Sequence, residues 1–217
     1  LGSVPKNSEL ILDSRHLGLI PVSEQKSLNK KIEKVAKEIS ESLSIEKIIK
    51  ITKNVPDLHE IHDTPKLKPK TTIAVALDSS FNFYYQDNLN ALRREGAKIK
   101  FFSPISDHKV PDCDGMYIGG GFPEVLGNSL GKNEKMRKSI KNLAEKNIPI
   151  YAECGGLMYL TKSIKDNNKK FPMVGLIDAE TEMTKKMTLN YTQGSVHNVC
   201  IISLRSNKLR GHEFHFS

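Results

Sequence analysis

The sequence has few cysteines and arranges none of them in pairs. Its 217 residues contain Cys113, Cys154 and Cys200, an odd number at wide spacing. This pattern excludes a disulfide framework and a Cys-x-x-Cys metal site, and it is typical of proteins from a reducing compartment. The sequence therefore predicts a cytoplasmic protein.

Long apolar runs and targeting patterns are also missing. No segment approaches the roughly 20 apolar residues that are needed to cross a bilayer. The first residues do not combine a basic start, an apolar core and a small-residue cleavage site. We therefore expect no membrane insertion.

A nucleotide-binding glycine motif is absent as well. The glycine run 119–121 follows a predicted strand, but it lacks the Gly-x-x-x-x-Gly-Lys-Ser/Thr order and the later acidic residue of a dinucleotide site. Two interpretations of this run remain open. It is either a tight turn that requires positive φ, or a set of backbone N–H groups that hold a developing oxyanion.

Positive charge, in contrast, is abundant. The formal net charge is +8 and the isoelectric point is near 9.3. The lysines are scattered through predicted helices and loops, without interleaved aromatic residues or a recognition motif. This distribution is typical of solvated helix faces, so we expect no nucleic-acid partner.

The segment from residue 71 onward alternates between strand and helix patterns. Strands are predicted at 72–77, 98–102, 115–118 and 148–151, and helices at 84–95 and 133–146. Two further apolar runs, 174–177 and 199–203, are strand candidates. The alternation predicts an α/β fold with a mostly parallel sheet flanked by helices.

The first 53 residues have a different pattern. Two helices are predicted, one capped by Ser23 with apolar residues from Leu28 to Ile39, and one over 44–51. The insert 13–16, which holds Arg15 and His16, is interpreted as a turn or as the end of a strand. Residues 54–70 contain three prolines among charged residues and predict a linker.

Cys154 lies at the most informative position in the sequence. A strand pattern ends just before it, and Gly155-Gly156 leads into an apolar helix pattern. This is the layout of a nucleophile elbow, in which a tight turn lifts the reactive side chain above the sheet. A helix that begins just after the sulfur is also expected to lower the pKa of the thiol. A buried structural cysteine is the alternative.

A cysteine nucleophile needs a histidine partner, which is usually distant in sequence. His212 and His215 are three residues apart, so on a strand they point to opposite faces. They are read either as catalytic candidates or as ordinary edge-strand residues. A zinc site of His212, Glu213 and His215 is disfavoured because alternating side chains do not converge on one point, and we expect no bound metal.

Three motifs together carry a family resemblance. They are Gly119-Gly-Gly-Phe-Pro-Glu124, Tyr151-Ala-Glu-Cys-Gly-Gly-Leu-Met-Tyr-Leu160 and Arg210-Gly-His-Glu-Phe-His-Phe-Ser217. In this order and at this spacing, the chain resembles the class I glutamine amidotransferase domain of cobyrinate a,c-diamide synthases. The resemblance implies a flavodoxin-like fold over residues 71–217, with the domain cut short at its C-terminus. It also implies that residues 1–53 are the end of an ATP-dependent synthetase domain.

The resemblance also implies roles for individual residues. The nucleophile of the family falls on Cys154 and its histidine on His215, and backbone N–H groups of Gly120, Gly121 and Gly155 hold the oxyanion. Many class I enzymes have a glutamate two positions after the histidine. Here Ser217 occupies that position, so the resemblance implies a dyad with no third residue that we can name.

The implied substrates follow from the same family. L-glutamine supplies ammonia, which a synthetase domain that uses ATP and Mg²⁺ adds to the a and c carboxylates of cobyrinate in cobalamin biosynthesis. Nickel sirohydrochlorin is an alternative tetrapyrrole, and a non-catalytic binding module is an alternative function. Because no P-loop is present, we interpret the chain as a fragment or as one subunit of a split enzyme that at most hydrolyses glutamine. The sequence leaves open whether it forms a homo-oligomer.

Overall fold

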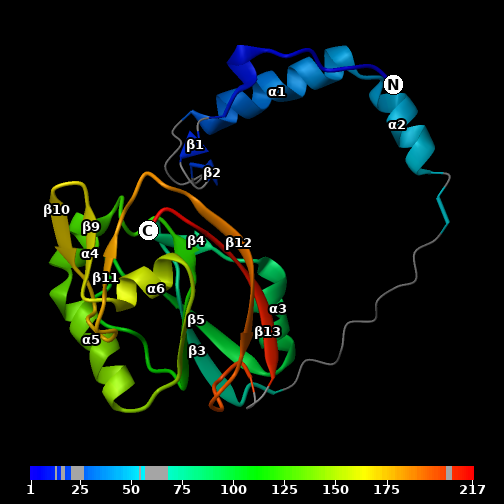
Figure 1. The fold of residues 1–217 in the computed structure, drawn as a ribbon. Coiled ribbons are helices and arrows are strands. Elements are labelled where there is room, and N and C mark those ends of the chain that lie inside the picture. Colours follow the sequence, from blue (N-terminus) through cyan, green and yellow to red (C-terminus); the bar gives the residue numbers. More distant parts are fainter. Residues whose placement is uncertain (13, 16–17, 21–26, 54, 57–67, 204–206) are drawn as a thin grey trace. The chain divides into compact units, whose positions relative to one another are not determined.

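The chain contains two compact units. The structure, a computed structural model, describes residues 1–12, 14–15, 18–20, 27–53, 55–56, 68–203 and 207–217 (Figure 1). The units are Leu1–Asp63 and Thr64–Ser217. Their division falls inside the interval 54–70 that the sequence predicts as a linker, most of which lies outside the described residues.

The described residues of the first unit include no buried side chain. Its elements are η1 (Ser8–Leu10), β1 (Ser14–Arg15), β2 (Gly18–Leu19), α1 (Leu28–Ser42) and α2 (Ile45–Thr52). Both predicted helices are present, but no residue of either is buried. The apolar residues of α1 and α2 are at most half-buried. The predicted cap Ser23 and His16 lie outside the described residues.

A parallel sheet forms the centre of the second unit. Its strands are β3 (Thr71–Ala76), β5 (Ala97–Phe102), β6 (Gly115–Ile118) and β8 (Ile150–Ala152), in the order β5-β3-β6-β8. All three neighbouring pairs are parallel. The predicted α/β fold with a mostly parallel sheet is confirmed.

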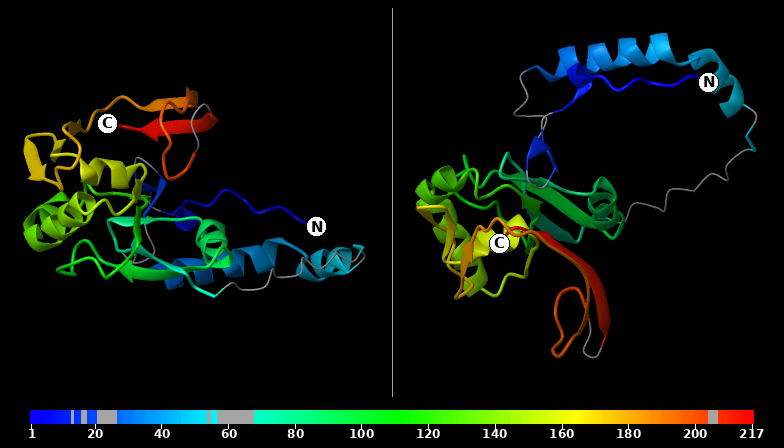
Figure 2. Two further views of the ribbon diagram at one scale, coloured as in Figure 1. Left: turned by 90° about the horizontal axis from the view of Figure 1, so that it is seen from below. Right: turned by 45° about the horizontal axis from the view of Figure 1, so that its top comes forward.

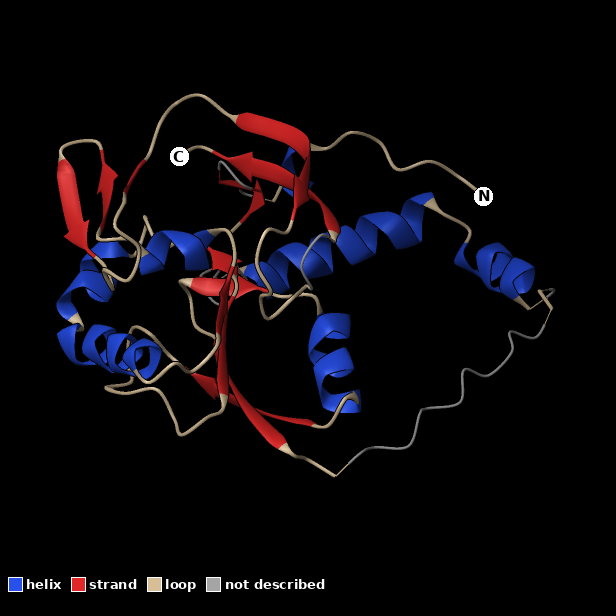
Figure 3. Cartoon of the chain, turned by 60° about the horizontal axis from the view of Figure 1, so that its bottom comes forward, coloured by secondary structure: helices blue, strands red, loops and turns tan. Residues whose placement is uncertain are grey.

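Helices cover both faces of this sheet (Figure 3). They are α3 (Gln86–Arg94), α4 (Gly127–Lys132), α5 (Glu134–Glu145) and α6 (Gly155–Leu160). Leu89 of α3 packs with Val75 and Tyr117 in one core cluster. The larger cluster contains residues of α4, α5 and α6, so the two faces of the sheet have separate cores.

Short strands surround the sheet. β4 (Phe81–Phe83) pairs with β7 (Gly120–Gly121), β9 (Ser163–Asp166) lies between β10 (Lys169–Pro172) and β11 (Glu180–Glu182), and β12 (Thr188–Ser195) pairs with β13 (Lys208–His215). Figures 1 and 2 show that the β12–β13 pair has its C-terminal end close to α6 and extends away from α6 at its other end.

Two predicted strands are wrong. Residues 174–177 wrap the end of α6 instead, because the N–H groups of Val174 and Leu176 donate to the carbonyls of Tyr159 and Leu160. Gly175, at φ 72°, breaks the extended backbone. Residues 199–203 form a turn closed by reciprocal backbone hydrogen bonds between residues 200 and 203.

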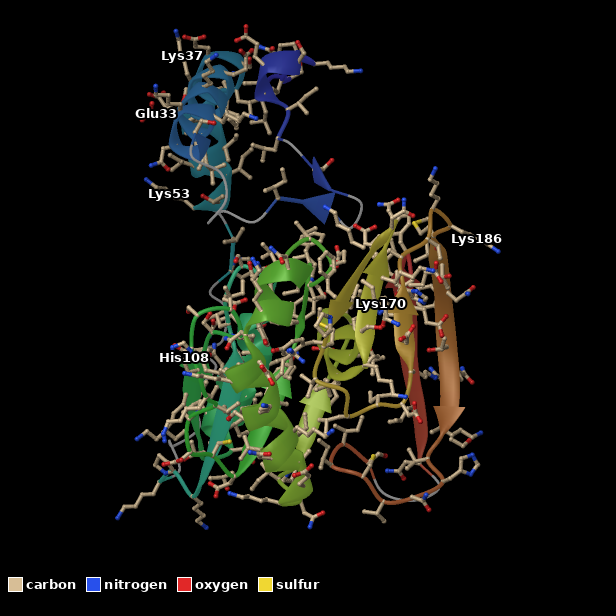
Figure 4. All side chains as sticks on the ribbon, turned by 90° about the vertical axis from the view of Figure 1, so that its left-hand side faces the viewer. Glu33, Lys37, Lys53, His108, Lys170 and Lys186 are labelled. Carbon is tan, nitrogen blue, oxygen red and sulfur yellow. The ribbon has the colours of Figure 1, made fainter. Side chains whose placement is uncertain are left out.

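Lysines are distributed over both units (Figure 4). Lys37 and Lys53 belong to the first unit, and Lys170 and Lys186 to the second. Several are paired with carboxylates, as in the 2.5 Å contact between Lys170 and Glu180. Across the described parts of both units, no helix is both long and apolar enough to cross a bilayer.

Candidate active site

Cys154 occupies a tight turn between β8 and α6. Its backbone has φ 50° and ψ −120°, a conformation that non-glycine residues rarely adopt, and its side chain is exposed. The turn depends on the two glycines that follow it. A Cβ atom at Gly156 would lie 2.2 Å from the carbonyl oxygen of Ile118, and one at Gly155 would lie 2.8 Å from Cδ of Pro123. The sequence thus folds here into the predicted elbow.

The glycine loop after β6 lies directly beside Cys154. A Cβ atom at Gly120 would lie 3.3 Å from Cβ and 3.4 Å from Sγ of Cys154. Gly121 approaches the preceding loop so closely that a Cβ there would lie 2.0 Å from the carbonyl oxygen of Ser80. The loop makes close backbone contacts and also borders the thiol, which is the placement that an oxyanion role would require.

Hydrogen bonds hold this loop against the end of β3. Phe122 donates its N–H to the Ser80 carbonyl at 2.9 Å. The hydroxyl of Tyr84 accepts the N–H of Gly119 at 2.8 Å and donates to the carbonyl of Ala76. Since β3 and β6 are neighbours, these bonds place the loop at the carboxyl edge of the sheet, where α/β proteins bind ligands.

The pKa of the Cys154 thiol is raised above its usual value. Loss of hydration at the sulfur, which the glycine loop borders although the residue as a whole is exposed, is the largest cause, and the charges of Glu124 and Glu153 add to it. The backbone N–H groups of Gly155 and Gly121 act in the opposite direction, because they donate toward the sulfur. The predicted lowering by the helix terminus is therefore outweighed. A base or an imidazolium must help to form the thiolate in this resting arrangement.

His215 is the last residue of β13 and is half-buried. Its Nδ1 accepts the backbone N–H of Ser217 at 3.4 Å. No hydrogen bond links His215 to Cys154 among the residues that the structure describes. Figures 1 and 2 show the end of β13 close to α6, the helix that begins directly after Cys154.

The other histidines lie elsewhere. His212 pairs with Tyr191 across the β12–β13 hairpin, three residues from His215 and therefore on the opposite face of the strand. His108 and His197 are exposed in loops, His108 as labelled in Figure 4. His59 and His62 lie outside the described residues.

The structure adds a polar cluster to which the sequence analysis assigned no role. The carboxylate of Glu153 accepts hydrogen bonds from the hydroxyls of Tyr117, at 2.5 Å, and Tyr151, at 3.2 Å. Tyr117 and Tyr151 are direct neighbours on β6 and β8. In the sequence, Tyr151 precedes Glu153 by two positions but Tyr117 precedes it by 36, so the sequence pattern does not bring both tyrosines to one carboxylate.

Metal ligands do not gather at this site. Within the described ranges, no group of three His, Cys, Asp or Glu side chains is placed so that it could hold a metal ion. Because the strand alternation separates His212 from His215, the C-terminal segment cannot direct both imidazoles to one point.

Comparison with known families assigns most of the chain to one domain family. Residues 72–217 match the family model described as CobB/CobQ-like glutamine amidotransferase domain. The chain belongs to this family. The matched range includes the whole central sheet of this amidotransferase domain, together with Cys154 and His215.

Curated relatives extend over the whole chain. A protein of Caldanaerobacter subterraneus named cobyrinate a,c-diamide synthase is 43% identical over 219 aligned residues, which cover 100% of this chain and 48% of the relative. A protein of the same name from Methanococcus maripaludis is 43% identical and is covered to 49%. The chain thus spans about half the length of the curated relatives that it matches.

Solved structures are more distant. The "Structure of PurLQS from Thermotoga maritima" matches with a TM-score of 0.48 and 18% identity, over 69% of this chain and 68% of that chain.

Proposed function

We propose that this chain hydrolyses L-glutamine and so supplies ammonia for an amidation reaction. The observation that carries the proposal is the exposed Cys154 on a strained elbow, with the glycine loop so close that a Cβ atom at Gly120 would lie 3.4 Å from its sulfur. Membership of the glutamine amidotransferase family supports glutamine as the amide donor.

The proposed chemistry follows from these groups. The Cys154 thiolate adds to the side-chain amide carbon of glutamine, and the carbonyl oxygen becomes an oxyanion within reach of the backbone at Gly120, Gly121 and Gly155. The C–N bond then breaks, and His215 gives the departing nitrogen its proton, which leaves a thioester. Water attacks the thioester, glutamate leaves, and the thiol is restored.

His215→Ala is expected to lower glutamine hydrolysis by roughly 100- to 10,000-fold, because the ammonia would leave without its proton donor. The test is glutamate release by the purified chain at several pH values. His212→Ala is the matched control, since it removes an imidazole from the opposite face of the same strand. Equal losses in the two variants would contradict the assignment of His215.

For the full-length protein we propose the reaction that the relatives are named for. Cobyrinate a,c-diamide synthase would use the ammonia to amidate the a and c carboxylates of the tetrapyrrole, with ATP and Mg²⁺ bound by a synthetase domain. The name shared by relatives that cover all of this chain supports cobyrinate as the substrate. In this proposal, residues 1–53 belong to the synthetase domain, residues 54–70 are a linker, and residues 71–217 produce the ammonia.

Residues 71–217 alone are expected to keep the unfolding midpoint and the glutamine hydrolysis of the whole chain. The physical reason is that both core clusters lie within Ile73–Met183, and the first unit contributes no residue to them. Urea unfolding and glutamate release measured on both forms would check this. A truncated chain that is unfolded in buffer would refute the proposed division.

A further inference from the structure

Glu153 is held in place through its side chain. Its carboxylate is half-buried and accepts the hydroxyls of Tyr117 at 2.5 Å and Tyr151 at 3.2 Å. The tyrosine rings are themselves fixed, since Tyr117 packs edge-on against Tyr151 at 5.3 Å and against Tyr84 at 5.1 Å between ring centroids. The carboxylate therefore has a defined position beneath the elbow.

The backbone of Glu153 is held as well. Its N–H donates to the carbonyl of Ile118 at 3.1 Å, and its carbonyl accepts the N–H of Gly156 at 2.9 Å. The next residue is Cys154, at φ 50° and ψ −120°. A non-glycine residue in such a region costs about 1–3 kcal/mol and persists only where its surroundings fix it. Glu153 is the residue through which β6 and β8 apply that constraint.

We propose that Glu153 is a positioning residue for the nucleophile: the two tyrosine hydroxyls fix its carboxylate, and the anchored residue holds the strained peptide that directs Cys154 toward glutamine. The inference rests on the proposed function and names a further residue needed for it. Glu153 itself does not touch the reacting atoms, because its carboxylate is engaged with the two tyrosines.

The charges around the site support this role. Burial and the bond to Glu153 raise the pKa of Tyr117, so its hydroxyl stays protonated and donates at neutral pH. The charged groups that act on the Cys154 thiol are Glu124 and Glu153, and both raise its pKa. The Glu153 carboxylate therefore hinders ionisation of the Cys154 thiol. This effect argues against an electrostatic role for Glu153 in forming the thiolate, and it is compatible with a role in positioning.

The test compares Glu153→Gln and Glu153→Ala with the unchanged 217-residue chain. Glutamine keeps one oxygen acceptor for a tyrosine, whereas alanine keeps none. We expect kcat for glutamine to fall by roughly 10-fold in the first variant and roughly 100-fold in the second, with KM changed by less than about 3-fold. Tyr85→Phe is the control. Tyr85 is 77% exposed, and it follows Tyr84, the tyrosine that packs against Tyr117.

A second readout separates positioning from general damage. Alkylation of Cys154 by iodoacetamide, followed against pH, should have a lower midpoint in Glu153→Gln, because a negative charge that opposes the thiolate is removed. The variant should thus ionise its thiol more readily and still turn over glutamine more slowly. If Glu153→Ala does not fold, Tyr117→Phe takes its place, since it removes the 2.5 Å donor while keeping the carboxylate.

The outcomes distinguish the two proposals. An active wild type whose Glu153 variants keep kcat within about 2-fold would overturn the inference and leave the proposed function standing. A wild type that folds and alkylates at Cys154 but releases no glutamate would overturn the proposed function, and the inference with it. Slower turnover together with a lower alkylation midpoint supports both.

Discussion

Replacing Cys154 by alanine is expected to lower glutamine hydrolysis by at least about 10,000-fold, because the sulfur is the atom that bonds to the amide carbon in the proposed mechanism. The remaining N–H groups at Gly121 and Gly155 can polarise a carbonyl but cannot form a thioester. The measurement is glutamate release over time by the variant and the unchanged chain at equal concentration.

Cys200→Ala is the matched control for this experiment. Cys200 is an exposed free cysteine in the turn at 199–203, and its bonds to Ser203 involve only backbone atoms. We expect the control to keep full activity. A glutamine-analogue electrophile should label the unchanged chain and the control at Cys154. Equal glutamate release by the unchanged chain and by Cys154→Ala would refute the assigned nucleophile, and no activity in either would favour a non-catalytic module.

Gly156→Ala is expected to destabilise the chain by about 3 kcal/mol and to remove its activity. The new Cβ atom would lie 2.2 Å from the carbonyl oxygen and 2.8 Å from the carbonyl carbon of Ile118, so α6 or β6 must move. A movement of α6 or β6 would also displace the elbow, because Gly156 donates its N–H to the carbonyl of Glu153, and Glu153 donates its own N–H to Ile118 of β6. Urea unfolding gives the change in stability.

Gly194→Ala is the control for the stability measurement. Gly194 lies in β12, and an added Cβ there meets no atom within 4 Å. Its free energy of unfolding should therefore stay within about 0.5 kcal/mol of the unchanged chain. A loss of similar size in both variants would show that the close approach of α6 to β6 is not what requires glycine at position 156.

The central part of the fold could be predicted because its signals are local. The predicted strand 115–118 has the same bounds as β6. The predicted helix 84–95 differs from α3 by two residues at its start and one at its end. The elbow was predicted for the same reason, since an apolar strand, a cysteine and two glycines are adjacent in sequence. The sequence pattern that predicts each of these features lies in neighbouring residues.

The features that were missed depend on residues far apart in the chain. Residues 174–177 are apolar enough for a strand, but the carbonyls at the end of α6 take their N–H groups. In residues 199–203, apolar side chains such as Val199, which is 69% exposed, occupy a turn. The bond from Tyr117 to Glu153 spans 36 positions. No local pattern reports such contacts, and so the role of Glu153 could be inferred only from the structure.

The pairing of β4 with β7 has a consequence for catalysis. Gly121 belongs to a two-stranded ladder with Phe81, and the adjacent Phe122 is bonded to Ser80, so this stretch of backbone is part of the folded framework. The direction of the Gly121 N–H group is therefore fixed once the chain has folded. In the proposed mechanism, charge develops on the substrate oxygen beside an N–H group that is already oriented, whereas water molecules around a free amide would have to turn toward the charge. In this mechanism the glycine loop is preorganised: its N–H dipoles are oriented by folding, before the substrate oxygen becomes charged.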